Sequence, residues 1–211
     1  MQPKLILAAA LAVAVTASIS TLPFTARAAA DPALGPDAIP AGTYVIDTKE
    51  TQARYTTNHM GFTEFSGIFP GAAGTMTIDP KQLVVTKLEV TVPVAGLETT
   101  NRELDHVLFS DQFFDGDKFP RLKFVSTAVT RTGPRTAKVV GDLTLHGITR
   151  PVTLDVTFNG AGPNSFKKNV LTLGFRAEGV VKRSDFGMGK YVPIVSDETA
   201  ITISAAFEKT G

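Results

Sequence analysis

The stretch PVTLDVTF, residues 151–158, indicates the fold class because apolar and polar side chains alternate along it without interruption. In an extended chain Val152, Leu154, Val156 and Phe158 share one face, and the polar residues between them share the other. A strand buried on both faces would instead read as a continuous apolar run. The stretch therefore predicts a β-strand with one face in the core and one face in water.

The same alternation recurs along most of the chain. It is clear in residues 86–94, 137–147, 171–177 and 199–208, and weaker in residues 43–47, 51–59, 74–79 and 121–127. Turn-forming pairs such as His146-Gly147 and Asn159-Gly160 separate neighbouring runs. The pattern therefore predicts eight or nine half-buried strands and a mainly β fold.

One short helical segment is predicted, from about residue 101 to residue 115. Thr100 followed by Glu103 fits a capping box, in which each side chain satisfies a free backbone N–H. One short helix cannot cover the dry faces of eight strands, so the sheet must close on itself or stack on another sheet. Short turns between consecutive antiparallel strands favour an up-and-down β-barrel of about eight strands, with the helical segment capping one end.

The interior of such a barrel has two alternative uses. A barrel of about eight strands is just wide enough to be filled by side chains or to hold one small ligand. The inward residues predicted here are mainly Leu, Val, Ile and Phe, so any ligand in the barrel would be apolar. The alternation alone leaves the filled and the hollow barrel open.

The first thirty residues differ from the rest and predict a cleaved secretory signal peptide. Lys4 precedes the uncharged apolar run of residues 5–19, and Ala26-Arg27-Ala28 offers a small-residue cleavage pattern. A membrane anchor is the alternative, but a span needs about 20 apolar residues. Residues 31–41 are rich in proline and small residues and predict a flexible leader. One domain is then expected over residues 42–209, with no membrane span after cleavage.

The composition excludes several classes of function. Without residues 1–30 the chain has 19 basic and 20 acidic residues, and this near-neutral balance argues against a nucleic-acid partner. The sequence contains no cysteine, so thiol catalysis, disulfides and cysteine-based metal sites are excluded. The remaining length suits one domain with a sizeable core.

The stretch SDQFFDGDKFPRLKF, residues 110–124, raises the question of a calcium loop because three aspartates surround a glycine. Counted from Asp111, the third position is Phe113 and the twelfth is Leu122, where an EF-hand needs oxygen ligands. We therefore reject the calcium loop. We expect Phe113 or Phe114, or both, to point into the barrel, and the aspartates to face solvent or cap the backbone.

Residues that could carry catalysis are few and scattered. His59, His106 and His146 lie far apart in the sequence and form no metal-binding motif. A G-x-S-x-G nucleophile elbow is absent. In the segment RSDFGMG, Arg183 and Asp185 could pair locally, or Arg183 could approach a polar headgroup at a pocket mouth. We assign no catalytic residue, no metal and no cofactor, and expect a protein that is not an enzyme.

Five segments carry a resemblance to a known family. They are YVID (44–47), HMGFTEFSGIF (59–69), TNRELDHVLFSDQFFDGDKFPRLKF (100–124), VVGDLTLHGITRPVTLDVTF (139–158) and KRSDFGMG (182–189). Together they resemble the YceI-like family of bacterial periplasmic proteins, also called polyisoprenoid-binding proteins. The resemblance implies a lipocalin-like barrel with a long apolar channel, a periplasmic location, and a homodimer as one expected state. It also implies binding or carriage of an isoprenoid (polyprenyl or quinone-like) or a similar long amphiphilic lipid.

The apolar channel implied by the family carries over to thirteen side chains of this sequence. They are Phe62, Phe65, Phe69, Leu88, Val90, Leu108, Phe113, Phe114, Phe124, Leu143, Leu145, Phe186 and Met188. Arg183 is the candidate headgroup contact. Ordinary core packing is the alternative for each of them. Two alternative functions also stay open, namely a metal-dependent or other enzyme using the same pocket, and a stress or interaction protein with a filled barrel.

Overall fold

A computed structural model of the protein describes residues 34–83 and 86–210, which belong to one compact unit. The predicted signal peptide lies outside these residues. The described part of the predicted leader is not free of the barrel. The Leu34 N–H donates to the Ala161 carbonyl at 3.2 Å, Pro36–Ala38 forms a 3-10 turn, and Ile39 is buried in the core. Residues 34–41 are therefore packed against the barrel, which corrects the expectation of a flexible leader over this range.

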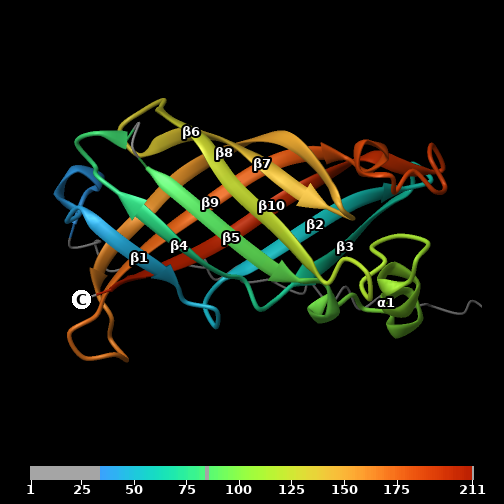
Figure 1. The fold of residues 1–211 in the computed structure, drawn as a ribbon, viewed down its shortest axis with the longest axis horizontal. Helices are drawn as coiled ribbons and strands as arrows, with labels where there is room; N and C mark the ends of the chain where they lie inside the picture. The colour runs from blue at the N-terminus through green and yellow to red at the C-terminus, as the bar shows by residue number, and fades with distance from the viewer. Residues whose placement is uncertain (1–33, 84–85, 211) are drawn as a thin grey trace, which may run out of the picture. The chain divides into compact units, whose positions relative to one another are not determined.

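The described residues form ten β-strands, one α-helix and short 3-10 turns (Figure 1). The strands are β1 (Gly42–Ile46), β2 (Gln52–His59), β3 (Thr63–Phe69), β4 (Ala73–Ile78), β5 (Lys87–Pro93), β6 (Arg121–Arg131), β7 (Thr136–Leu145), β8 (Ile148–Pro163), β9 (Leu171–Lys182) and β10 (Val195–Lys209). The helix is α1 (Arg102–Phe109), and further 3-10 turns are η3 (Val94–Gly96) and η4 (Arg183–Phe186). None of the helices in the described ranges is long and apolar enough to cross a membrane.

Eight of these strands close into an antiparallel barrel. They follow the order β1-β4-β5-β6-β7-β8-β9-β10, and β10 pairs back onto β1. The stretch PVTLDVTF lies in β8, where Val152, Leu154 and Phe158 are buried while Thr153 and Asp155 are exposed. The prediction of a mainly β, lipocalin-like barrel of about eight strands with one short helix is confirmed.

The β2–β3 hairpin extends the barrel wall at one end. β10 is long enough to pair with β1 through Phe207–Lys209 and with β2 through Thr199–Ser204 on the same edge. β3 pairs with β2 and is linked through Ile68 to Glu98. The alternation did not predict β3, because Gly67 occupies an inward position without a side chain to mark it.

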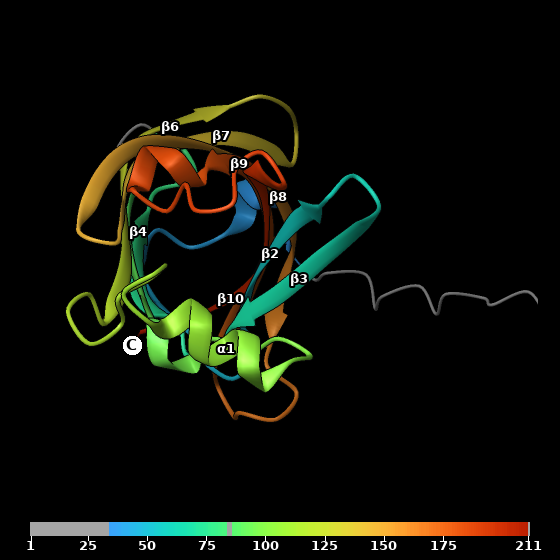
Figure 2. The same ribbon diagram turned by 90° about the vertical axis from the view of Figure 1, so that its right-hand side faces the viewer.

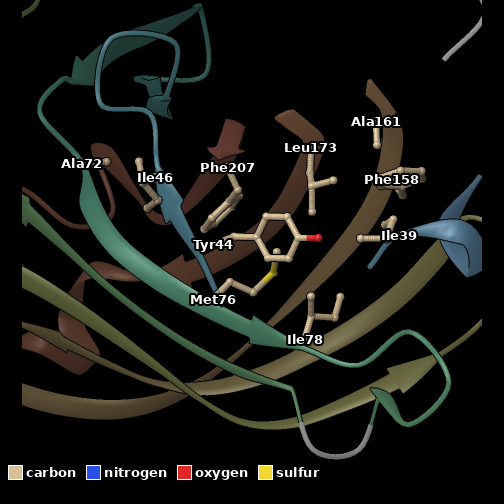
Figure 3. Packing of buried hydrophobic residues seen from close by; sticks show 10 residues of the cluster. All are labelled: Ile39, Tyr44, Ile46, Ala72, Met76, Ile78, Phe158, Ala161, Leu173 and Phe207. Carbon is tan, nitrogen blue, oxygen red and sulfur yellow. The ribbon is translucent and has the colours of Figure 1, made fainter. Parts of the chain in front are cut away.

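The core at the β1 end is built around Tyr44, whose side chain is fully buried. Figure 3 shows its ring between Met76, Phe207 and Ile39, which come from distant parts of the chain. The Tyr44 hydroxyl donates to the Pro40 carbonyl at 2.6 Å, so the buried polar group is satisfied. Burial raises the pKa of Tyr44, which keeps the phenol protonated as a donor.

An ion-pair latch at the same end holds the turn between β8 and β9 onto β1 and β10. Lys167 Nζ lies 2.7 Å from an oxygen of Asp47 and 2.7 Å from an oxygen of Glu208. Asp47 is 7% exposed. The hydrogen bond from Lys167 holds the pKa of Asp47 below its ordinary value.

Helix α1 lies at the opposite end of the barrel (Figure 1), along the lower edge of the ring of strands in Figure 2. Asn101, not Thr100, is its N-cap, because the Asn101 side-chain oxygen accepts from the N–H groups of Glu103 and Leu104 at 3.0 and 3.3 Å. The predicted capping box is therefore wrong by one residue. Asparagine caps a helix as well as serine or threonine does, and its position decides which N–H groups it reaches.

Candidate functional site

A cavity of about 680 Å³ occupies the interior of the barrel. All ten strands and α1 contribute to its wall, and nearly all the side chains facing it from the middle of the barrel are apolar. Pockets that hold small ligands have volumes of about 300–1,000 Å³ and predominantly apolar linings. The barrel is therefore hollow, and this observation decides against the filled-barrel alternative.

Most of the predicted channel residues line this cavity. The eleven that do so are Phe65, Phe69, Leu88, Val90, Leu108, Phe113, Phe114, Phe124, Leu143, Leu145 and Met188. They come from strands β3, β5, β6 and β7, from α1 and from the loops that follow α1 and η4. The geometry thus brings them together around one space, while their contact with a ligand stays a prediction.

Two predicted residues do not line the cavity. Phe62 is 83% exposed because it lies in the turn between β2 and β3, which the Phe62 N–H closes by donating to the His59 carbonyl at 3.1 Å. Phe186 is 1% exposed and packs in a core cluster with Leu145 and Met188. Phe62 therefore faces outward. Phe186 packs against the lining residues Leu145 and Met188 without lining the cavity itself.

The two neighbouring phenylalanines after α1 both point into the barrel, as expected. Phe114 meets Phe69 edge-on with ring centroids 5.4 Å apart, and Phe113 lies 6.2 Å from the Tyr191 ring. Both line the cavity. Asp115 adopts a left-handed backbone with φ 46°, a conformation that aspartate tolerates in turns. The segment is therefore part of the cavity wall.

Arg183 also lies at the cavity wall, where it anchors the loop between η4 and β10. Its guanidinium donates to the carbonyl oxygens of Met188 and Lys190 at 2.7 and 3.2 Å, and to those of Val195 and Ser196 at 3.1 and 3.0 Å. Burial lowers the pKa of Arg183, and the nearby Asp197 opposes this effect.

Little of the Arg183 guanidinium is left for a ligand. Four of the five N–H donors of an arginine side chain are engaged by these carbonyl groups. The local pair of Arg183 with Asp185 is also replaced by another arrangement. Asp197 accepts from the backbone N–H and the hydroxyl of Ser184 at 2.8 and 2.6 Å. One guanidinium N–H group is left to donate to a ligand. The contact of Arg183 with a lipid headgroup therefore stays a prediction.

The weakly alternating strand β2 supplies cavity residues that were not predicted. Ala53, Tyr55 and Thr57 occupy every second position and line the cavity. The Tyr55 hydroxyl is buried, and none of the residues described by the structure accepts or donates a hydrogen bond to it. Burial, with a smaller effect from Asp105, raises the pKa of Tyr55 to about 12. The alternate spacing of these three residues could have predicted their inward position. It was not recognised, because alanine, tyrosine and threonine do not form a clearly apolar face.

The three histidines are held on separate elements. His59 ends β2, His106 lies on α1, and His146 lies in the turn between β7 and β8. The Nδ1 atom of His146 is 3.1 Å from the Phe186 carbonyl oxygen. Within residues 34–83 and 86–210, no three His, Asp or Glu side chains gather into a group that could hold a metal ion.

Comparison with known proteins agrees with this architecture. A UPF0312 protein of Pseudomonas savastanoi pv. phaseolicola is 37% identical over 150 residues, which cover 70% of this chain and 77% of the relative. BcnA of Burkholderia cenocepacia superposes with a TM-score of 0.69 at 24% identity, covering 76% of this chain and 98% of BcnA. A polyisoprenoid binding domain from Saccharophagus degradans has a TM-score of 0.59 at 9% identity, covering 81% of this chain and all (100%) of that domain.

The likeness to the two solved structures concerns the fold. Family membership rests on the sequence, because the model of the YceI-like domain matches residues 44–207, which span the barrel from β1 to β10. The chain therefore belongs to the family of proteins with a YceI-like domain.

Proposed function

We propose that the protein binds an isoprenoid, or a similar long amphiphilic lipid, in the barrel cavity and carries it in the periplasm without converting it. The observation that carries this proposal is the apolar cavity of about 680 Å³ enclosed by the barrel. The name of the Saccharophagus domain, which shares the fold, describes binding of the same class of ligand.

The physical basis of the proposed affinity is burial of the lipid tail. Each Å² of apolar surface removed from water contributes roughly 25 cal/mol. Selectivity among lipids should be low, because few polar groups face the cavity to fix the position of a lipid chain. We therefore expect the protein to accept several tail lengths and several headgroups.

The first test identifies what the protein holds. The exported protein is extracted gently from the periplasm and weighed by native mass spectrometry, which also reports whether it is a monomer or a homodimer. We expect an added mass of a prenyl lipid, or uptake of a prenyl quinone such as ubiquinone by ligand-free protein. Protein that carries no lipid and fails to take up the quinone would show that the proposal is wrong.

The second test concerns location. Fractionation of cells that express the full chain should place the processed protein in the periplasm, because residues 1–30 have the features of a cleaved signal. A substitution that introduces an arginine into the apolar run, such as Ala12→Arg, should retain the unprocessed chain inside the cell. Processed protein in the cytoplasmic fraction would contradict the proposed location.

A further inference from the structure

A group of exposed apolar side chains lies on two adjoining loops at the α1 end of the barrel (Figure 1). It consists of Met60 and Phe62 in the turn between β2 and β3, and of Tyr191, Val192 and Ile194 in the loop between η4 and β10. We refer to these five residues as the mouth patch. Phe62 is 83% exposed and Ile194 is 61% exposed. Single exposed apolar residues are ordinary, but a group on adjoining loops indicates a surface that meets an apolar partner.

The two loops of the mouth patch are physically joined. The Met60 N–H donates to the Ile194 carbonyl at 2.8 Å, so a backbone hydrogen bond joins the hairpin tip to the loop between η4 and β10. Figure 1 shows the tip of the β2–β3 hairpin beside the loop that precedes β10, where Val195 pairs with His59. The loop is further anchored by the buried guanidinium of Arg183. The apolar tips are therefore presented in a defined arrangement.

The mouth patch continues the lining of the cavity. Tyr191 is half-exposed, yet its ring also lines the cavity and lies 6.2 Å from the Phe113 ring. His59 and Thr63, which flank the hairpin turn, line the cavity as well. The lining of the cavity thus reaches the mouth patch at this end of the barrel.

Backbone conformation singles out the same residues independently. Among the described residues, five non-glycine residues have a positive φ, and Asp115, His146 and Asn169 are of types that tolerate it. The other two are Met60 with φ 59° and Tyr191 with φ 66°, and both belong to the mouth patch. A hairpin turn of this kind favours Asn or Gly. Large apolar side chains at such positions break the local rule, which is expected where function requires the side chain.

We propose that the mouth patch docks onto a lipid bilayer, so that a lipid passes between the membrane and the cavity without crossing water. This inference rests on the proposed lipid-binding function. Lys190 supports it, because its ammonium lies 5.1 Å from the Tyr191 ring centroid, and a lysine beside a tyrosine is a common anchor at a membrane interface. A second protein fits less well as the partner, since stable protein interfaces use roughly 20–30 residues on each side. The mouth patch consists of only the five residues named above.

The test compares two variants of the processed protein with wild type. Phe62→Ser combined with Ile194→Ser removes the most exposed apolar side chains of the mouth patch. The matched control is Phe166→Ser, because Phe166 is 98% exposed in the turn between β8 and β9, which lies at the opposite end of the barrel (Figure 1). Vesicles of phosphatidylethanolamine and phosphatidylglycerol that contain ubiquinone serve as the membrane. Flotation measures association, and ubiquinone recovered with the protein measures transfer.

We expect the mouth variant to take up ubiquinone from vesicles at least about tenfold more slowly than wild type, and to float less. The control should behave as wild type. The proposal is overturned if all three proteins associate with vesicles and extract ubiquinone equally. It is also overturned if sedimentation shows that wild type is a dimer that the mouth variant breaks, with unchanged transfer from vesicles.

A parallel measurement separates this proposal from the proposed function. Ubiquinone delivered from ethanol, without vesicles, should reach the cavity of wild type and of the mouth variant to the same extent at equilibrium. If wild type takes up no ubiquinone by this route, the lipid-binding function itself fails. If it does take up ubiquinone but ignores vesicles, only the docking proposal fails. The single variant Phe62→Ser repeats the test should the double variant have a lowered melting temperature.

Discussion

Replacing Arg183 by methionine tests whether this residue anchors the η4 loop or contacts a ligand. Methionine keeps much of the apolar stem and removes the guanidinium. Four carbonyl groups then lose their donor, at distances between 2.7 and 3.2 Å in the structure. A stability loss without a specific loss of affinity would identify an anchor, and the reverse would identify a headgroup contact.

The expected destabilisation follows from these hydrogen bonds. A hydrogen bond to a charged group contributes about 1.5–3 kcal/mol to folding, and an unsatisfied buried partner loses a similar amount. The bond to the Met188 carbonyl is buried, whereas the other three lie in partly buried positions that water can reach. We therefore expect a loss of about 3 kcal/mol rather than the sum over four full bonds.

Thermal unfolding followed by circular dichroism measures this effect. For a domain of this size each kcal/mol shifts the melting temperature by about 2–4 °C, so Arg183→Met should lower it by about 6–12 °C. Arg183→Lys should lose about half as much free energy, because an ammonium has three donors and no planar fork. The exposed Arg150→Met should change stability by less than about 0.5 kcal/mol.

If Arg183→Met melts within about 2 °C of wild type, a shift of no more than about 1 kcal/mol, Arg183 is not the anchor of the loop between η4 and β10. Ubiquinone binding is measured in parallel, well below the melting temperature. An anchor predicts an equilibrium affinity close to that of wild type. A large loss of affinity at unchanged stability would instead support the headgroup contact.

Three further predictions test the cavity, the latch and a buried hydroxyl. Ala177→Phe should fill part of the cavity and weaken lipid binding at least about tenfold in a fluorescence titration, whereas Ala200→Phe on the outer face of β10 should not; equal affinities would contradict the assigned cavity. Asp47→Asn should destabilise the fold at pH 7 in urea unfolding. Because the folded-state pKa of Asp47 is lowered, the stability from its pairing with Lys167 is present above the ordinary carboxyl pKa of about 3.9 and is lost as pH falls through the folded value. The difference between variant and wild type should therefore shrink toward pH 3, and a constant difference would argue against the latch. Tyr55→Phe should leave the melting temperature unchanged or raise it, since the buried hydroxyl has no partner among the described residues; a loss above about 1.5 kcal/mol would refute this.

Much of the fold could be predicted from local pattern. A side-chain period of two requires an extended chain with one dry face, so PVTLDVTF specified both a strand and its inward residues Val152 and Leu154. The lack of covering helices then required closure, and the structure has that closure. Most inward phenylalanines of the cavity followed from the same pattern and from family resemblance. Strand β3 was not predicted from the alternation, because Gly67 at an inward position has no apolar side chain.

Local residue patterns were enough to predict most strands, their inward faces and the class of side chain that lines the interior. The pairing of β10 with both β1 and β2 could be seen only in the folded chain, because strand partners are chosen by contacts between residues about 150 positions apart. That the barrel is hollow could likewise be seen only in the folded chain, since a cavity depends on the summed volume of side chains from all ten strands. The anchoring role of Arg183 could not be predicted from the sequence for a different reason. Its partners are backbone carbonyl groups, which every residue carries and which no residue type therefore indicates.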